Sequence, residues 1–258
     1  LVMIKMLNII GLGLGDPKDI TIKGKEAIEK STHVYLESYT SILTDSNINA
    51  IEDFFSKKII PLSRGDLEDN DKIFENTKND DVSLLIVGDV FSATTHSEIL
   101  MRVKEEGIDV NIIHNASIFT AISITGLQLY KFGKTTTIVK PEGSWFPKSP
   151  YDIIKQNKEI NAHTLCLLDI KIDKNYFMTI NEALNLLLEM EKEKGDGIID
   201  DETYVVGVSN LGGDHKIKSG KIKNLIDYDF SKPPHSLIIP NKLHFTEKEV
   251  LEFWNTMN

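Results

Sequence analysis

Apolar and polar positions follow two alternating patterns along nearly the whole chain. Short runs of apolar and β-branched residues predict strands, and the segments between them, with apolar residues three and four positions apart, predict helices. In the first half the predicted strands are residues 7–12, 34–36, 59–62, 82–87 and 110–113. The predicted helices are residues 21–30, 48–55, 67–78 and 95–106. The uninterrupted apolar run Leu84-Leu85-Ile86-Val87 suits a strand covered on both faces, so this half predicts a parallel α/β sheet.

The second half has a different succession of elements. Its predicted strands are residues 136–139, 164–170, 204–208 and 236–240. One long helix is predicted over residues 179–194, where apolar residues share one side and Gly195 follows the last turn. Proline-rich residues 141–150 and the pair Pro233-Pro234 predict loops. The change in pattern places a domain boundary near His114, which gives an N-terminal α/β domain of residues 1–113 and a C-terminal α/β domain of residues 114–258.

The composition is that of a globular protein and narrows the range of partners. Of the 258 residues, 41% are hydrophobic and 26% are charged, which argues against a disordered or coiled-coil chain. The formal net charge of −10 disfavours a nucleic-acid partner, because such proteins concentrate Lys and Arg against phosphates. No apolar run approaches the ~18 residues that a membrane span needs, so we expect no membrane partner and a cytoplasmic location.

Few residues in the chain point to metal or nucleophile chemistry. Cys166 is the only cysteine, and its apolar neighbours predict a buried strand residue. The segment His96-Ser97-Glu98 has the H-x-E form of a zinc deaminase, but no Cys-x-x-Cys follows it. The sequence has neither the H-E-x-x-H motif of zinc proteases nor the G-x-S-x-G turn of serine hydrolases. We therefore expect no metal.

A glycine run, Gly11-Leu12-Gly13-Leu14-Gly15-Asp16, follows the first predicted strand. Glycines in this place mark a sharp turn or a close approach of backbone to a ligand. Gly11 and Gly13 match the G-x-G-x-x-G fingerprint of dinucleotide binders, but Asp16 replaces its third glycine, which disfavours NAD. Gly133-Lys134-Thr135 imitates the end of a phosphate-binding loop, yet Gln128 stands where that loop needs glycine. We interpret Gly133 as part of a turn.

Small and polar residues also gather where three other strands are predicted to end. Asp89 follows strand 82–87, on the ligand side of an open α/β sheet. It either meets a ligand or caps the next helix, although Thr94 or Thr95 could supply that cap instead. Ser117 is either a helix N-cap or a hydroxyl directed at a ligand, and Asp169 lies near the end of strand 164–170. The spacing predicts a cofactor site without identifying the cofactor.

Taken together, these segments resemble the diphthine synthase family. The matching blocks are residues 10–21 (IGLGLGDPKDIT), 34–43 (VYLESYTSIL), 87–97 (VGDVFSATTHS), 113–118 (IHNASI), 126–133 (GLQLYKFG), 163–171 (HTLCLLDIK), 233–239 (PPHSLII) and 242–244 (KLH). They occur in the order that the family has. The Asp16 that breaks the dinucleotide fingerprint belongs to the family's G-x-G-x-G-D form. Members commonly begin just before the first strand, so Met6 matches the family's start and residues 1–5 are expected to be an extension.

The resemblance implies a fold of two α/β domains of the tetrapyrrole methylase type, with S-adenosylmethionine in the cleft between them and usually a homodimer. The cofactor contacts that it implies, position by position, are Leu14, Asp89, Ser92, Ser117, Ile118, Leu168, Leu211 and His235. Other members more often have Pro at Val90 and Gly or Val at Ser92, changes that backbone contacts would tolerate. The region of Leu211 is one residue shorter than in other members, so this assignment depends most on the alignment.

The resemblance also implies the reaction. Members use S-adenosylmethionine to methylate the amino group of a 3-amino-3-carboxypropyl chain on a histidine of translation elongation factor 2, in diphthamide biosynthesis. Archaeal-type members stop at the trimethylammonium product, and eukaryotic-type members add a fourth methyl group to the carboxylate. Residues 114–118, 163–171 and 214–217 look closer to the eukaryotic type, which we favour, whereas residues 141–147 look closer to the archaeal type.

Methyl transfer from a sulfonium requires alignment of a neutral amine and exclusion of water more than a strong base. We therefore assign no catalytic residue, and Glu37, Tyr39 and His96 are the candidates if a base exists. Two other interpretations stay open. A tetrapyrrole methylase acting on a small molecule would share the fold and the cofactor. A non-catalytic adaptor would have lost the cofactor, and the intact glycine run and Asp89 argue against it.

Overall fold

The computed structural model describes residues 6–38, 42–63, 65–66, 72–92 and 96–257. The chain divides into two compact units, Leu1–Ala121 and Ile122–Asn258, which we call unit 1 and unit 2. In this division residues 114–121, which the sequence analysis assigned to the second domain, belong to unit 1. Tyr39, Thr94, Thr95 and the first five residues of the predicted helix 67–78 lie outside the described residues.

Unit 1 contains the predicted parallel sheet. Its five strands run in the order β3-β2-β4-β1-β5, and every adjacent pair is parallel. Their bounds are β1 (Met6–Gly11), β2 (His33–Glu37), β3 (Ile59–Leu62), β4 (Val82–Ile86) and β5 (Asp109–Ile113). Because side chains alternate along a strand, Leu7 and Ile9 join the hydrophobic cluster on one face and Ile10 joins that on the other.

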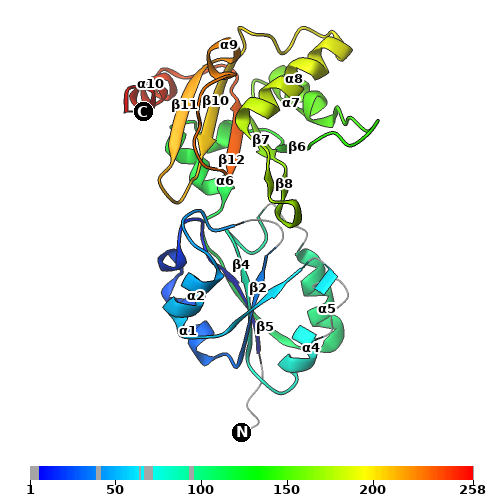
Figure 1. The fold of residues 1–258 in the computed structure, drawn as a ribbon, viewed down its shortest axis with the longest axis vertical. Helices are drawn as coiled ribbons and strands as arrows, with labels where there is room; N and C mark the ends of the chain where they lie inside the picture. Colours follow the sequence, from blue (N-terminus) through cyan, green and yellow to red (C-terminus); the bar gives the residue numbers. More distant parts are fainter. Residues whose placement is uncertain (1–5, 39–41, 64, 67–71, 93–95, 258) are drawn as a thin grey trace. The chain divides into compact units, whose positions relative to one another are not determined.

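Helices cover both faces of this sheet (Figure 1). α1 (Ile22–Lys30) and α2 (Ile48–Phe55) pack on one face, and α4 (Lys72–Thr77) and α5 (Ser97–Glu106) pack on the other. Local sequence sets where the helices begin: the Thr21 hydroxyl accepts from the Gly24 amide at 3.0 Å, which caps α1. All parallel strands end at the same edge, so the loops that follow β1, β4 and β5 meet there.

Unit 2 is built on a mixed sheet with the strand order β11-β10-β12-β7-β6. The bounds are β6 (Thr136–Ile138), β7 (Thr164–Leu168), β10 (Tyr204–Ser209), β11 (Lys216–Lys221) and β12 (His235–Ile239). β6 and β7 are parallel, and the other pairs are antiparallel. Cys166 on β7 is fully buried, as predicted, and burial raises the pKa of its thiol to about 12.

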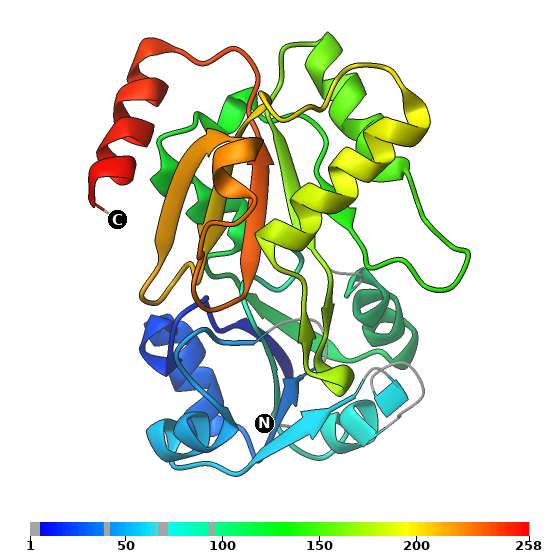
Figure 2. The same ribbon diagram turned by 45° about the horizontal axis from the view of Figure 1, so that its top comes forward.

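The main core of unit 2 lies between its sheet and two helices, α7 (Ser149–Glu159) and α8 (Ile180–Lys194). The Thr179 hydroxyl caps α8 by accepting from the Glu182 amide at 3.1 Å. α10 (Phe245–Met257) lies beside the edge strand β11, where the Asn255 side chain accepts from the Ser219 amide at 2.9 Å (Figure 2). The short α6 (Ile118–Ala121) ends unit 1, and α9 (Ile222–Leu225) follows β11.

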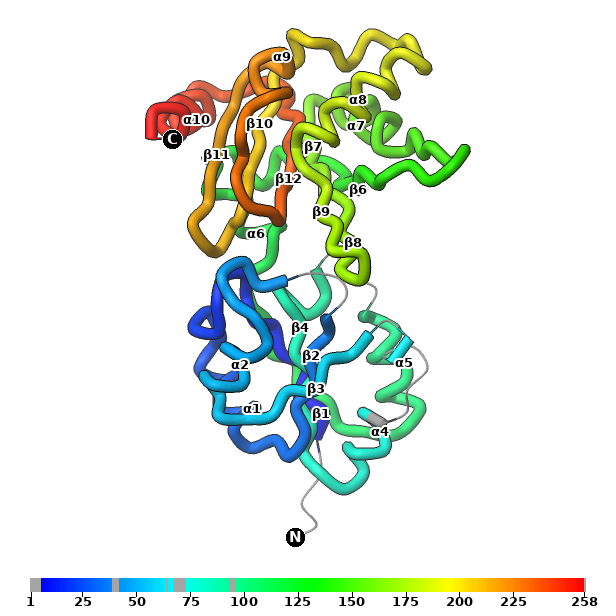
Figure 3. The backbone as a smooth tube through the Cα atoms, in the orientation of Figure 1, coloured from blue at the N-terminus to red at the C-terminus, as the bar shows by residue number. Residues whose placement is uncertain are grey.

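Three predictions for unit 2 need correction. The predicted strand 164–170 breaks at Asp169, whose amide donates to the Ile138 carbonyl at 3.0 Å and ends β7. The next residues form the two-residue strands β8 (Ile170–Lys171) and β9 (Tyr176–Phe177), which pair as a hairpin (Figure 3). The predicted loop 141–150 already contains the start of α7, because Pro150 suits a first helical turn. The polar strand β11 and the helices α7 and α10 were not predicted.

Candidate functional site

The glycine run is shaped by the close approach of two loops at the carboxyl edge of the unit 1 sheet. Gly13 and Gly88 exchange two backbone hydrogen bonds of 3.1 and 2.7 Å. A Cβ on Gly11 would lie 2.7 Å from the Gly88 carbonyl oxygen, and Gly13 has a φ of +79° that side chains rarely adopt. Asp16 closes the following turn by accepting from the Lys18 amide at 2.6 Å. The glycines therefore satisfy packing and turn geometry first.

Asp89 joins the loop after β4 to the loop after β5. Its Oδ1 accepts from the Phe91 amide at 3.2 Å and the Ser92 hydroxyl at 3.0 Å. Its Oδ2 faces His114 Nδ1 at 2.8 Å and accepts from the Asn115 amide at 3.1 Å. Burial disfavours the charged form, but these hydrogen bonds outweigh it and hold the pKa of Asp89 below its ordinary value. Its side chain does not cap α5, so that alternative is wrong.

Asn115 was missed as a functional candidate, although it lies in the IHNASI block. Its side-chain nitrogen donates to the carbonyl oxygens of Gly11 and Asp19, both at 3.0 Å. Its backbone amide donates to Asp89, so one residue connects the loops after β1, β4 and β5. A Cβ on Gly11 would lie 2.9 Å from the Asn115 Cβ, which explains why the first glycine is needed. The sequence feature that could have indicated Asn115 is its position between the end of a predicted strand and the start of a helix.

The five predicted contacts of unit 1 converge on these loops. A Cβ built on Gly88 would lie 3.9 Å from Leu14 Cδ2 and 4.0 Å from Ser117 Cα. Leu14 and Ser117 therefore lie close to Gly88, which Asp89 follows in the chain. Ser92 is bonded to Asp89. Ser117 is buried, and its carbonyl accepts from the Thr120 and Ala121 amides at 3.1 and 2.8 Å, which places it at the start of α6. Ile118 is the first residue of that helix.

The three predicted contacts of unit 2 converge at one edge of its sheet. Ser209 at the end of β10 pairs with His235 at the start of β12. Leu167, beside Leu168 at the end of β7, pairs with Ser236. The Asn210 amide donates to the Pro234 carbonyl at 2.9 Å, which brings Leu211 to the same edge.

Both ring nitrogens of His235 bond to backbone groups of unit 2. Its Nδ1 accepts from the Ile180 amide at 3.2 Å, at the start of α8, and its Nε2 donates to the Ser231 carbonyl at 3.2 Å. Burial is the main reason why the pKa of His235 lies below its ordinary value. Because Nδ1 accepts from an amide, it carries no proton in this arrangement. Neither ring nitrogen of His235 is therefore free to bond a ligand.

Of the three candidate bases named from the sequence, Glu37 and His96 lie in the interior of unit 1, and Tyr39 lies outside the described residues. Glu37 at the end of β2 and His96 are both buried, with Glu37 Oε2 and His96 Nε2 3.8 Å apart. His96 Nδ1 lies 3.3 Å from the Val90 carbonyl. Burial lowers the pKa of His96, although the charge of Glu37 opposes this shift. His96 thus contacts the loop that carries Asp89.

Other sequence candidates have structural roles. Gly133 forms the predicted turn before β6, where a Cβ would lie 2.2 Å from Asn157 Oδ1. Asp169 Oδ2 accepts from the Lys140 amide at 3.1 Å. Among the residues that the structure describes, no three His, Cys, Asp or Glu side chains form a group that could hold a metal ion. Within the same residues, no helix is both long and apolar enough to cross a membrane.

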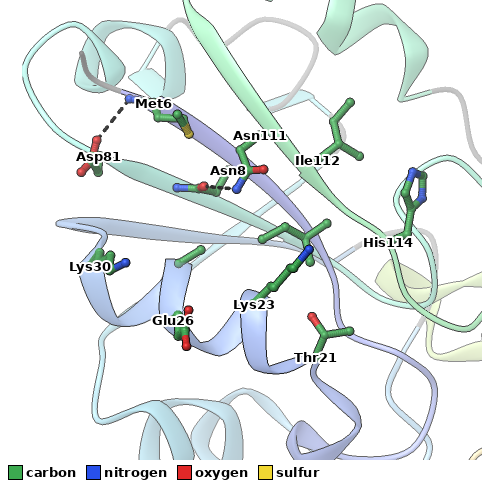
Figure 4. Close-up of a pocket in the computed structure, with 12 residues that line it drawn as sticks. Met6, Asn8, Thr21, Lys23, Glu26, Lys30, Asp81, Asn111, Ile112 and His114 are labelled. Carbon is green, nitrogen blue, oxygen red and sulfur yellow. Dashed lines mark hydrogen bonds between the residues drawn. The ribbon is translucent and has the colours of Figure 1, made fainter. Parts of the chain in front are cut away.

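A cavity of about 620 Å³ lies in unit 1 beside the edge strand β5. Figure 4 shows Met6 and Asp81 at one end and His114 at the other. The lining is mixed, with side chains of α1 facing β1 and β5, and consists of Met6, Asn8, Thr21, Lys23, Glu26, Ala27, Lys30, Asp81, Asn111, Ile112, Ile113 and His114. The cavity therefore reaches the same edge at which the three loops meet.

Comparisons with known proteins agree over nearly the whole chain. Residues 6–226 match the family model described as Tetrapyrrole (Corrin/Porphyrin) Methylases. The diphthine synthase of Methanocaldococcus jannaschii is 49% identical over 252 residues, which are 96% of this chain and 98% of the relative. That of Methanococcus maripaludis strain C6 is 46% identical over 250 residues, with the same coverage. A crystal structure of diphthine synthase has a TM-score of 0.87 and 38% identity, and covers 97% of this chain and 96% of its own.

Proposed function

Because the chain belongs to the tetrapyrrole methylase family and, within it, to the diphthine synthases, we propose that it methylates the modified histidine of translation elongation factor 2. The chain is an S-adenosylmethionine-dependent methyltransferase of diphthamide biosynthesis. The observation that carries the proposal is the meeting of the family's blocks at Gly13, Asp89 and Asn115. We propose the cytosol as its place of action. We also propose that it assembles as a homodimer, and light scattering in solution tests this assembly.

For the cofactor, S-adenosylmethionine, we propose the eight predicted contacts. Unit 1 contributes Leu14, Asp89, Ser92, Ser117 and Ile118, and unit 2 contributes Leu168, Leu211 and His235. The residues of unit 1 fit such a ligand, because, among the described residues other than Gly88 and its two chain neighbours, no atom comes closer than 3.9 Å to a Cβ built on Gly88. Backbone groups of the surrounding loops can therefore approach a ligand there.

The roles within this set differ. The Asp89 carboxylate already accepts from two backbone amides and the Ser92 hydroxyl and faces His114 Nδ1, so we assign it to holding the loops in place. We assign His235 a contact through its backbone, because both of its ring nitrogens are bonded within unit 2. The cofactor supplies a methyl group already activated by the positive sulfur. The protein's task is to hold an amine in line with that methyl group and to exclude water.

The number of methyl groups is part of the proposal. The sequence blocks favour the four-methyl reaction, whereas the relatives at 49% and 46% identity are archaeal proteins named diphthine synthase. We propose the trimethylated amine as the product on the strength of these relatives. The four-methyl prediction is the alternative that the experiment below distinguishes.

The test is mass spectrometry of elongation factor 2 that carries the precursor side chain, after incubation with this protein and S-adenosylmethionine. A gain of three CH₂ units supports the proposed product, and a gain of four supports the ester-forming alternative. No gain overturns the proposed function. A parallel incubation with a porphyrin-type precursor tests the small-molecule alternative, and binding of S-adenosylhomocysteine excludes an adaptor that has lost the cofactor.

A further inference from the structure

His114 differs from the other histidines near the proposed site in its exposure. It follows the last residue of β5, and 67% of its side chain is exposed, whereas 2% of the His96 side chain is. Its Nδ1 lies 2.8 Å from Asp89 Oδ2. The ring of Phe91 packs edge-on against its ring, with the centroids 6.4 Å apart. Two neighbours therefore orient the imidazole while it stays open to solvent.

The carboxylate of Asp89 also determines where the imidazole carries its proton. A carboxylate can only accept, so a neutral His114 donates Nδ1–H to Asp89 and has its lone pair on Nε2. Among the described residues, no hydrogen bond is made to Nε2. The cavity that His114 lines also contains the charged side chains of Lys23, Glu26 and Lys30 of α1 and of Asp81. The result is an Asp–His pair with an accessible basic nitrogen.

The proposed reaction needs an amine that has lost its proton before each transfer, and a positioned base would speed that step. At neutral pH an aliphatic amine is mostly an ammonium ion, which has no lone pair for attack on the methyl carbon. Each of the first two transfers again produces an ammonium that carries N–H. A positioned base within reach of that N–H contributes about 10²–10⁴-fold to the rate in other enzymes.

We propose that His114, oriented by Asp89, is the catalytic base that removes a proton from the substrate ammonium before each methyl transfer. His114 Nε2 takes the proton, and the freed lone pair forms the new N–C bond while the S–C bond breaks and its electrons remain on sulfur. The imidazolium then releases its proton to water, to which it is exposed. After the third transfer the nitrogen carries no hydrogen, and the base has nothing further to remove. This proposal rests on the proposed function.

The first test replaces His114 by asparagine. In His114→Asn the amide nitrogen takes the place of Nδ1 and still donates to Asp89, but the basic Nε2 is lost. We expect the single-turnover rate at neutral pH to fall by about 10²-fold. This loss should shrink at higher pH, where the amine loses its proton without help from the protein. The affinity for S-adenosylhomocysteine, measured by calorimetry, should stay at the wild-type value.

The matched control is His33→Asn. His33 begins β2, at the opposite end of the same sheet, and its Nε2 lies 3.5 Å from Asp80 Oδ2. It is therefore also a histidine beside an aspartate in unit 1, and this substitution should leave the rate and its pH dependence unchanged. In a second test, added imidazole should restore part of the rate of His114→Ala, because the exposed position admits it.

The outcomes separate this inference from the proposed function. A wild-type rate and pH profile in His114→Asn, with an active parent, overturns the base and leaves the proposed function intact. A rate loss matched by lost cofactor affinity overturns it in favour of a positioning role. Nitrogen NMR gives a readout that needs no substrate: an Nε2–H tautomer of His114 in the wild type overturns the proposed Asp89–His114 pair. Failure of the wild type to methylate the factor overturns the proposed function itself.

Discussion

At the scale of single residues, Asp89 and Asn115 decide the geometry of the proposed site. Asp89 holds the loop after β4 to that after β5, and Asn115 extends the connection to Gly11 and Asp19 in the loop after β1. Because buried carboxylates and amides lose water on folding, they stabilise only if all of their partners are present. Changing either residue should therefore affect several loops together.

Asp89→Ala is expected to weaken cofactor binding by about tenfold or more, since the amides of Phe91 and Asn115 and the ring of His114 lose their acceptor. Calorimetric titration with S-adenosylhomocysteine measures the effect. Asp169→Ala, which removes a loop carboxylate bonded to the Lys140 amide in unit 2, is the comparison and should bind more tightly than Asp89→Ala. Wild-type affinity in Asp89→Ala would remove this residue from the proposed set.

At the scale of elements, one buried carboxylate joins the start of α10 to the rest of unit 2. Glu247, in the first turn of α10, accepts from the amides of Gln128 and His244 at 3.0 and 2.7 Å. It also accepts from the Lys131 ammonium and faces His163 Nε2 at 3.1 Å. Burial opposes its charge, but these hydrogen bonds lower the pKa of Glu247 to about 2. The last helix thus depends on an ionised group with no exposed surface.

Because the pKa of Glu247 is lower in the folded state than in the unfolded chain, its contribution to stability is complete above the ordinary carboxyl pKa of 4.5. It is lost as pH falls from there to about 2. Glu247→Gln should lower the free energy of unfolding near neutral pH by about 2–3 kcal/mol and flatten this acid limb. Urea unfolding at several pH values measures both, and the exposed Glu189→Gln should change neither. An unchanged acid limb in Glu247→Gln would contradict the assignment.

At the scale of the whole molecule, the agreement with relatives extends over 96% of the chain, so both units belong to the family and not only the glycine run. Unit 1 has a parallel sheet and unit 2 a mixed one. Each has its own hydrophobic core, and a fully buried Leu or Ile side chain contributes about 1.5–3 kcal/mol to such a core. Ligand binding to the intact chain should therefore be measurable as a rise in its unfolding temperature.

Saturating S-adenosylhomocysteine should raise the unfolding temperature of the wild type, since a ligand at 100 times its Kd stabilises by about 2.7 kcal/mol. Gly11→Ala should lose this shift, because the new Cβ would lie 2.7 Å from the Gly88 carbonyl and force the loops apart. Gly220→Ala adds the same group where the nearest atom is 3.6 Å away and should keep the shift. Differential scanning fluorimetry compares the three proteins. An equal shift in Gly11→Ala would show that the loop contact is not needed for binding.

The sequence by itself determined the parallel sheet of unit 1, the long helix α8 and the family. Continuous apolar runs, apolar residues at helical spacing and ordered glycine-rich blocks are local signals, and each depends on a few neighbouring residues. It did not predict β11, whose residues are largely polar because it is an edge strand, nor the break of β7 at Asp169. These features depend on partners distant in sequence.

The arrangement of the proposed site was decided only by tertiary structure. The sequence placed Asp89 and the IHNASI block at strand ends, but the pairing of Asp89 with His114 and Asn115 joins positions 25 and 26 residues apart. It offered Glu37, Tyr39 and His96 as candidates if a base exists, but the structure buries Glu37 and His96 and leaves His114 exposed. Exposure and hydrogen-bond partners arise when strands from distant parts of the chain pack side by side. No local pattern of residue types encodes them.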